Sequence, residues 1–343
     1  MNSVNVDGIW KSTEDMYANV NGAWKRASES FVNVNGIWKK NYAIAGIDWI
    51  ERSTGTNFNT LNSVCYGNGL FVAVAGGIGS SGNKVMTSSD GINWTSSASA
   101  VDNDLRSVCY GNGLFVAVSW PDQNGNRVMT SPDGINWTST VSVASNQWMS
   151  VCYGNGLFVA VSATGNGNRV MTSPDGINWT PRTSAANNVW MSVCHGNGMF
   201  VAVAMSGNGN SVMTSPDGIN WTLQSSAADS AWWSVCYGNG LFVAIAYSSS
   251  STNDRVMTSS DGINWTLRAL LSNISWRSVC YGNGLFVAVG VGGFGIMTSF
   301  DGINWEYKAN PVDTVTWYSV CYGNGLFVAV SGDARIITSS RIG

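Results

Sequence analysis

One block of sequence recurs seven times in this chain, at intervals of 41 to 44 residues, and this regular spacing limits the folds open to it. The block reads Ser-Val-Cys-Tyr-Gly-Asn-Gly-Leu-Phe-Val-Ala-Val or a close copy. A period of this length is typical of the blade of a β-propeller. A single small sheet cannot bury both of its faces, whereas neighbouring copies stacked in a ring can. The copies are marked by their single cysteines: Cys65, Cys109, Cys152, Cys194, Cys236, Cys280 and Cys321.

Within one copy, alternating apolar residues and two short turn signals predict a four-stranded antiparallel sheet. In the copy from 148 to 182, the Asn-Gly pair at 155–156 favours a two-residue hairpin, because both central residues of a type I′ turn have positive φ. The Asp-Gly pair at 175–176 predicts a second tight turn. The expected strands are 148–153, 157–162, 169–173 and 177–180.

The composition favours β-structure and argues against several kinds of partner. Only 11% of the residues are charged, 40 of the 343 are glycine, and the net charge is −3 at pH 7. We therefore expect an all-β protein that lacks the basic surface needed for nucleic acid. No stretch approaches the roughly 18 apolar residues of a membrane span, so we expect no membrane insertion. Evenly spaced single cysteines suit neither a disulfide framework nor a zinc site, and we interpret them as one repeated core position.

The two ends of the repeat array predict how the ring closes. Six copies contain the turn and fourth strand Gly-Ile-Asn-Trp, but the seventh stops after its third strand, at residues 335–339. A matching segment, Gly46-Ile47-Asp48-Trp49-Ile50, lies before the first copy. We expect this segment to pair with the third strand of the last copy. The result is a seven-bladed β-propeller over residues 43–343.

The segments Thr-Ser-Pro-Asp-Gly-Ile-Asn-Trp (130–137, 172–179 and 214–221) and Thr-Ser-Ser-Asp-Gly-Ile-Asn-Trp (87–94 and 258–265) resemble the Asp-box of sialidase-like propellers. Here Asp and Gly are adjacent, one residue tighter than in the usual box. In that family the box is a structural turn, in which the aspartate caps backbone N–H groups and the tryptophan packs between sheets. The resemblance implies this turn role for Asp90, Asp133, Asp175, Asp217, Asp261 and Asp301.

The resemblance does not extend to catalysis. Retaining sialidases need an arginine cluster for the substrate carboxylate, a tyrosine nucleophile with a partner glutamate, and an acid/base aspartate. The only glutamates here are Glu14, Glu29, Glu51 and Glu306, and none falls on the inner strand of a blade. The single histidine, His195, replaces a tyrosine in one copy, which we interpret as a tolerated substitution. We expect no enzymatic activity, no cofactor and no metal; a carbohydrate-active hydrolase is the third alternative for function.

Residues 1–42 hold a different repeat, with a period of 14 residues. Val4–Lys11 recurs as Ala18–Lys25 and Val32–Lys39, each reading as a strand, an Asp-Gly or Asn-Gly turn and a second strand. Isolated hairpins are marginal in water and would expose their tryptophans. We therefore expect residues 1–42 to pack on other tail proteins or on further copies in a homo-oligomer; the alternative is a small self-contained sheet. The segment is similar to hairpin repeats of bacteriophage tail and fibre proteins, which implies a place in the virion after synthesis in the host cytoplasm.

Strand direction places both tight turns of a blade on one face of the ring and both variable connections on the other. Recognition usually resides in variable loops on a rigid scaffold, so the variable face is the predicted binding surface. There each first strand begins with an aromatic residue or, at Leu61 and Leu105, a leucine; the aromatic residues either stack on sugars or fill space between blades. Five of the third strands begin there with a cation, and these cations either meet acidic sugars or form a solvated edge. These two sets are Trp148, Trp190, Trp232, Trp276 and Trp317, and Lys84, Arg127, Arg169, Arg255 and Arg335.

Together these features predict a non-enzymatic phage tail or fibre protein. Its propeller would bind a host surface receptor, either a glycan or a protein, through the variable face. The alternative is a purely architectural virion or scaffold protein, in which the propeller is a docking platform for other proteins.

Overall fold

The computed structural model describes residues 48–53, 60–77, 83–120, 126–247, 255–268, 274–292, 295–312 and 314–340, together with six short strands between residues 3 and 40. The chain divides into two compact units, Met1–Ile47 and Asp48–Gly343. The two repeats in the sequence had predicted this division after residue 42.

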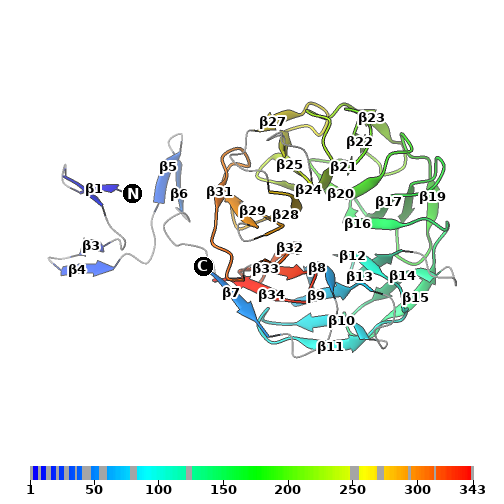
Figure 1. The fold of residues 1–343 in the computed structure, drawn as a ribbon, viewed down its shortest axis with the longest axis horizontal. Helices are drawn as coiled ribbons and strands as arrows, with labels where there is room; N and C mark the ends of the chain where they lie inside the picture. The colour runs from blue at the N-terminus through cyan, green and yellow to red at the C-terminus, as the bar shows by residue number, and fades with distance from the viewer. Residues whose placement is uncertain are drawn as a thin grey trace. The chain divides into compact units, whose positions relative to one another are not determined.

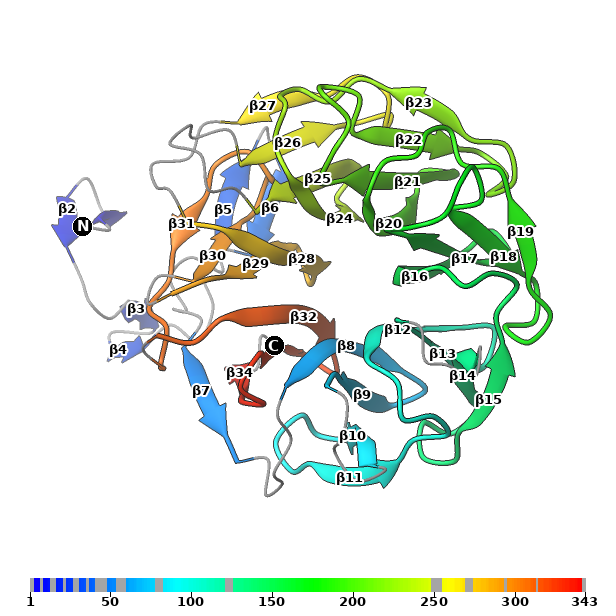
Figure 2. The same cartoon turned by 45° about the vertical axis from the view of Figure 1, so that its right-hand side comes forward.

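The unit Asp48–Gly343 is a seven-bladed β-propeller, as the seven copies of the repeat predicted (Figures 1 and 2). Each blade is a four-stranded antiparallel sheet, with its first strand nearest the central axis and its fourth strand at the rim. None of the described residues lies in a helix, so this part of the chain offers no helical membrane span.

The strands fall into four concentric sets. The first strands are β8 (Leu61–Gly67), β12 (Leu105–Gly111), β16 (Trp148–Gly154), β20 (Trp190–Gly196), β24 (Trp232–Gly238), β28 (Trp276–Gly282) and β32 (Trp317–Gly323). The second strands are β9 (Leu70–Ala75), β13 (Leu114–Ser119), β17 (Leu157–Ser162), β21 (Met199–Ala204), β25 (Leu241–Ala246), β29 (Leu285–Gly290) and β33 (Leu326–Ser331). The third strands are β10 (Asn83–Ser88), β14 (Asn126–Ser131), β18 (Val170–Ser173), β22 (Val212–Ser215), β26 (Val256–Ser259), β30 (Ile296–Ser299) and β34 (Ile336–Ser339). The fourth strands are β11 (Thr95–Ala98), β15 (Thr138–Val141), β19 (Thr180–Arg182), β23 (Thr222–Gln224), β27 (Thr266–Arg268), β31 (Glu306–Tyr307) and β7 (Trp49–Arg52).

The hydrophobic core lies between neighbouring blades. In strand β21, Phe200 and Ala202 pack against the preceding blade, whereas Val201 and Val203 pack against the following one. All four side chains are fully buried. Because both faces of the second strand are covered, its sequence is a continuous apolar run instead of an alternation of apolar and polar residues.

The ring closes as predicted, through a strand from the beginning of the propeller. Strand β7 pairs antiparallel with β34 of the last blade, with Trp49 opposite Ser339 and Ile50 opposite Thr338. The backbone N–H of Ser340 also donates to the carbonyl of Asp48. Gly46 and Ile47, which belong to the same sequence match, lie outside the described residues.

The first of the two predicted turns is confirmed, and the second is longer than predicted. Asn155 and Gly156 both have positive φ (48° and 77°), as a type I′ turn requires. The fourth strand, however, is Thr180–Arg182 and not 177–180. Asp175 explains the difference, because its Oδ1 accepts the backbone N–H groups of Ile177 and Asn178 at 2.9 and 2.8 Å. These N–H groups are satisfied within the turn and take no part in the ladder with β18.

This turn is a compact hydrogen-bonded unit. Ser173 donates to Asp175 Oδ1 at 2.8 Å, and the side-chain amide of Asn178 donates to Oδ2 at 2.7 Å. The indole of Trp179 donates to the carbonyl of Gly176 at 2.9 Å and packs in a core between blades. The same aspartate geometry recurs at Asp90, Asp133, Asp217, Asp261 and Asp301.

The hydrogen bonds to the aspartate favour its charged form. Donation from the Asn178 backbone and side chain, and from the Ile177 backbone, holds the pKa of Asp175 well below its usual range. The ionised form of Asp175 therefore stabilises this turn more than the neutral form does.

In the unit Met1–Ile47, the six strands form three antiparallel hairpins, in agreement with the 14-residue repeat. The predicted packing of residues 1–42 on other chains depends on side chains that lie outside the described part of the structure. The hairpins are β1 (Ser3–Val6) with β2 (Ile9–Ser12), β3 (Tyr17–Val20) with β4 (Ala23–Arg26), and β5 (Phe31–Val34) with β6 (Ile37–Lys40).

The closing strand gives a direct test of the ring. Trp49 is 7% exposed, whereas its neighbour Ile50 on the same strand is 45% exposed. We expect Trp49→Ala to lower the free energy of unfolding by about 3–5 kcal/mol, because a buried tryptophan leaves a cavity. Ile50→Ala is the matched control and should change it by less than about 0.5 kcal/mol. Urea unfolding measures both, and equal stabilities for the two variants would contradict this closure.

The turn aspartates predict a dependence of stability on acid. A folded-state pKa below the unfolded value of about 4 contributes stability above that pH, and the contribution is lost as the pH falls through the folded pKa. The melting temperature of Asp175→Asn should therefore fall less than that of the wild type when the pH is lowered from 5 to 2. Ile177→Ala alters the same turn but keeps the carboxylate, and it should parallel the wild type. Thermal unfolding at a series of pH values tests this, and parallel curves for Asp175→Asn and wild type would refute it.

Candidate binding site at the mouth of the central channel

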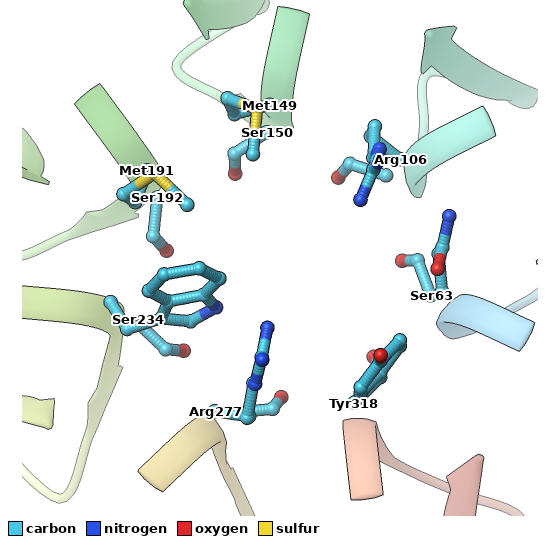
Figure 3. A pocket seen from close by; sticks show the side chains of 14 residues that line it. Ser63, Arg106, Met149, Ser150, Met191, Ser192, Ser234, Arg277 and Tyr318 are labelled. Carbon is cyan, nitrogen blue, oxygen red and sulfur yellow. The ribbon is translucent and has the colours of Figure 1, made fainter. Parts of the chain in front are cut away.

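The seven first strands surround a cavity of about 170 Å³ at the centre of the propeller (Figure 3). Each strand contributes two consecutive residues to it. We call the first of each pair the rim residue and the second the ring serine. The rim residues are Asn62, Arg106, Met149, Met191, Trp233, Arg277 and Tyr318, and the ring serines are Ser63, Ser107, Ser150, Ser192, Ser234, Ser278 and Ser319.

A β-bulge explains why two consecutive residues face the channel. In every blade the pairing of first and second strand shifts register around the rim residue, for example between Trp148 and Ser150. A bulge interrupts the strict alternation of side chains, so Met149 and Ser150 both point inwards. Trp148, immediately before the bulge, is buried between blades.

The ring serines join each blade to the next. The Oγ of each serine accepts the backbone N–H of the valine that follows the ring serine in the next blade, at 3.1 to 3.2 Å. The bond from Val64 to Ser319 closes this ring between the first and last blades. The rim residues are therefore presented from a rigid circle of hydrogen bonds.

The rim residues divide the mouth into an apolar arc and a polar arc. Met149, Met191 and Trp233 follow one another on consecutive blades. The remaining four are Arg277, Tyr318, Asn62 and Arg106, and they complete the circle.

The two rim arginines differ in their partners. Arg106 forms an ion pair with Asp104, and its guanidinium lies 3.6 Å from the ring centre of Trp120. Asn62 also donates to Asp104, at 3.0 Å. The carboxylate beside Arg106 is thus fully engaged.

Arg277 is surrounded by aromatic rings. Its guanidinium lies 4.6 Å from the ring centres of Trp233 and Tyr247 and 4.9 Å from that of Tyr318. Among the described residues no carboxylate pairs with it, and its buried Nε has no hydrogen-bond acceptor. Cation–π contacts therefore hold the side chain in place without neutralising its charge.

The prediction that a ring of tryptophans forms a binding platform is wrong. These tryptophans pack between blades, which was the alternative. Trp148, Trp190, Trp232, Trp276 and Trp317 are fully buried. Trp190 donates its indole N–H to the carbonyl of Ala186 at 3.1 Å, so even its polar atom faces the protein. The physical reason is the bulge, which turns the next residue instead of the tryptophan towards the channel.

The predicted cationic ring is also corrected, because four of its five members are turned into the protein. Lys84, Arg127 and Arg255 are buried, and Arg169 is partly buried. Arg169 donates from Nε to the carbonyl of Gly165, at 2.8 Å, and from Nη1 to those of Ala163 and Asn188, at 2.7 and 2.9 Å.

These cations join the variable connections of the propeller. Lys84 donates to the carbonyls of Gly77 and Asn103 and pairs with Asp102 at 2.8 Å. The donors satisfy loop carbonyls that would otherwise lack partners. Arg335 alone is exposed, and it pairs with Glu51 and Asp333 at 3.1 and 3.0 Å. Neither an acidic-sugar site nor a merely solvated edge describes the buried members.

The cysteines and the histidine carry no sign of catalytic activation. Burial raises the pKa of Cys152 and of its equivalents in the other blades, which disfavours the reactive thiolate. Burial also lowers the pKa of His195, whose ring lies 4.6 Å from that of Phe200. Within the described part of the chain, no three His, Cys, Asp or Glu side chains come together as a metal site.

The rim residues were not among the predicted site residues, although the sequence contains a signal for them. In the first strands, the residue before Ser-Val-Cys differs strongly between copies, as Asn, Arg, Met, Met, Trp, Arg and Tyr. Variation at one position of an otherwise constant strand indicates a residue that the scaffold does not constrain. Its direction into the channel depends on the bulge, which the sequence pattern did not predict.

No model of a known protein family matches this sequence, and no curated protein matches it either. Solved structures with a similar fold include virginiamycin B lyase from Staphylococcus aureus, with a TM-score of 0.74 and 10% identity over 86% of this chain and 100% of that one. YCF48 from Cyanidioschyzon merolae has a TM-score of 0.63 and 14% identity over 85% of this chain and 98% of its own. The WD40 propeller domain of Doa1 has a TM-score of 0.63 and 12% identity over 86% and 98%. YCF48 has also been solved bound to D1 peptide, and that structure is 15% identical over 85% and 96%, with a TM-score of 0.63. At these identities the likeness is one of fold.

Proposed function

We propose that this protein is a non-enzymatic recognition module of a phage tail or fibre, which binds a host surface receptor through the channel mouth and the variable connections around it. The observation that carries this proposal is that the first strands differ from one another mainly at the rim residues. Inner strands that are otherwise near copies present seven side chains of mixed chemistry at one cavity. Such a constant frame with a variable rim suits recognition.

The chemistry of the mouth supports binding over catalysis. Its ring serines accept backbone N–H groups from the next blade, and Asp104, the carboxylate beside the rim, is engaged by Arg106 and Asn62. A nucleophile requires a neighbouring base, and neither His195 nor a free carboxylate lines this cavity. A carbohydrate-active hydrolase therefore has less support than a binding protein.

A protein receptor has more support than a glycan. The tryptophans that would have formed a sugar platform are buried. Among propellers of similar fold, YCF48 has been solved with a peptide bound. The same observation also favours the second candidate function, a virion or scaffold protein whose propeller docks other proteins.

The 14-residue hairpin repeat supports an attachment role for residues 1–42, with the chain located in the virion and joined to itself or to other tail proteins.

The channel mouth can be tested by filling it. We expect Met149→Trp to reduce binding of the fluorescently labelled full chain to susceptible bacterial cells by at least about tenfold, equivalent to about 1.4 kcal/mol. Ile219→Trp adds the same side chain on the face of the tight turns, where Ile219 is exposed, and it should leave binding unchanged. Flow cytometry over a panel of strains measures both. Equal binding by the two variants would exclude the mouth, and no binding to any strain would favour the architectural alternative.

The attachment role predicts a change of assembly state. A chain of residues 43–343 should keep a cooperative thermal transition but run as a single propeller, whereas the full chain should have the mass of an oligomer or join a tail complex. Light scattering coupled to size-exclusion chromatography measures the masses. A monomeric full chain that also binds no tail protein would contradict the role of residues 1–42.

A further inference from the structure

We propose that the channel mouth binds a carboxylate group of a partner polypeptide, with Arg277 as the residue that pairs with it. This inference rests on the proposed function, because it names the chemistry that the same mouth would recognise. The carboxylate is either an acidic side chain or the C-terminal end of the partner.

The two rim arginines provide an internal comparison. Arg106 and Arg277 occupy the same position in their blades, and both stack on aromatic rings. Arg106 is neutralised by Asp104, which lies two residues before it, whereas the corresponding residue before Arg277 is Ser275. The described residues place no carboxylate beside Arg277. At this position one arginine is therefore neutralised by a carboxylate, whereas the other has no counterion among the described residues.

The surroundings of Arg277 favour an incoming acceptor. The ring serines Ser234, Ser278 and Ser319 use an Oγ lone pair to accept a backbone N–H, which leaves each hydroxyl hydrogen free to donate. None of these hydroxyls donates to an acceptor within the described part of the protein. A cavity lined by a guanidinium and by these hydroxyl donors suits a carboxylate and repels a cation.

The size and the apolar arc favour a peptide. A cavity of about 170 Å³ admits a group the size of one side chain and is smaller than the roughly 300–1,000 Å³ of sites for larger ligands. Next to Arg277 along the rim lie Trp233 and Met191. Methionine adapts its shape to different apolar partners, as a peptide-binding surface requires. A phosphate group would bring more charge than the single unneutralised guanidinium can balance.

The first experiment uses random hexapeptides attached to beads through their N-termini, screened with the full-length labelled protein. Retained sequences should carry Asp, Glu or a required free C-terminus. Asn or Gln in place of the acid, or amidation of the C-terminus, distinguishes the two sources of carboxylate, and the correct change should weaken binding by at least about tenfold. Arg277→Met should have the same effect, whereas Arg268→Met, on the outer strand β27, should not.

The second experiment does not depend on the identity of the peptide and keeps the wild-type side chain. The Nε–H signal of Arg277 in an NMR spectrum should shift saturably with sodium propionate but not with propionamide or sodium chloride. The Nε–H of Arg268, which donates to Thr258 at 2.8 Å, should not respond.

The outcomes separate this inference from the proposed function. Retained peptides that lack a carboxylate, binding that survives Arg277→Met, or an Arg277 signal that ignores propionate would each overturn the carboxylate assignment. The channel mouth would remain the binding site if Met149→Trp still reduced binding to cells by at least about tenfold. A propionate response of Arg277 together with cell binding that ignores Met149→Trp would instead overturn the proposed function.

Discussion

Seven hydrogen bonds between neighbouring inner strands hold the centre of this propeller. In each, a serine Oγ accepts the backbone N–H of a valine in the next blade, and the bond from Val64 to Ser319 joins the last blade to the first. Since every blade supplies the same donor and acceptor, the inner strands are presented in an equivalent way. The residue before each serine therefore reaches the channel in an equivalent way in every blade, and five types of side chain occupy these seven positions.

As a consequence, two residues of the same type can have different roles, which are set by the side chains around them. Arg106 and Arg277 occupy equivalent positions, but Asp104 neutralises the first and three aromatic rings surround the second. Two of those rings, Trp233 and Tyr318, come from the blades on either side of Arg277. The electrostatic character of the mouth is thus a property of adjacent blades taken together.

The buried cations of the third strands have a complementary task. The connections on the variable face contain many backbone carbonyls that no strand partner satisfies. Lys84 and Arg169 each donate to carbonyls of two different connections, so each stabilises a pair of loops at once. A long side chain with several donors is well suited to this because it can reach both loops from one strand. In the described part of the variable face, these hydrogen bonds tie neighbouring connections to each other.

Turn chemistry acts over a few neighbouring residues, so local signals were sufficient for the Asn-Gly turns. The repeat itself predicted the number of blades and a closing segment at 46–50, which overlaps the observed strand Trp49–Arg52. These signals were insufficient for the mouth. Because of the bulge before each ring serine, Met149 faces the channel together with Ser150, whereas Trp148 is buried between blades. The cavity, the aromatic surroundings of Arg277 and the loop contacts of Lys84 arise from segments that only the folded ring brings together. The sequence by itself determined the repeating scaffold, and the tertiary structure decided which side chains that scaffold offers to a partner.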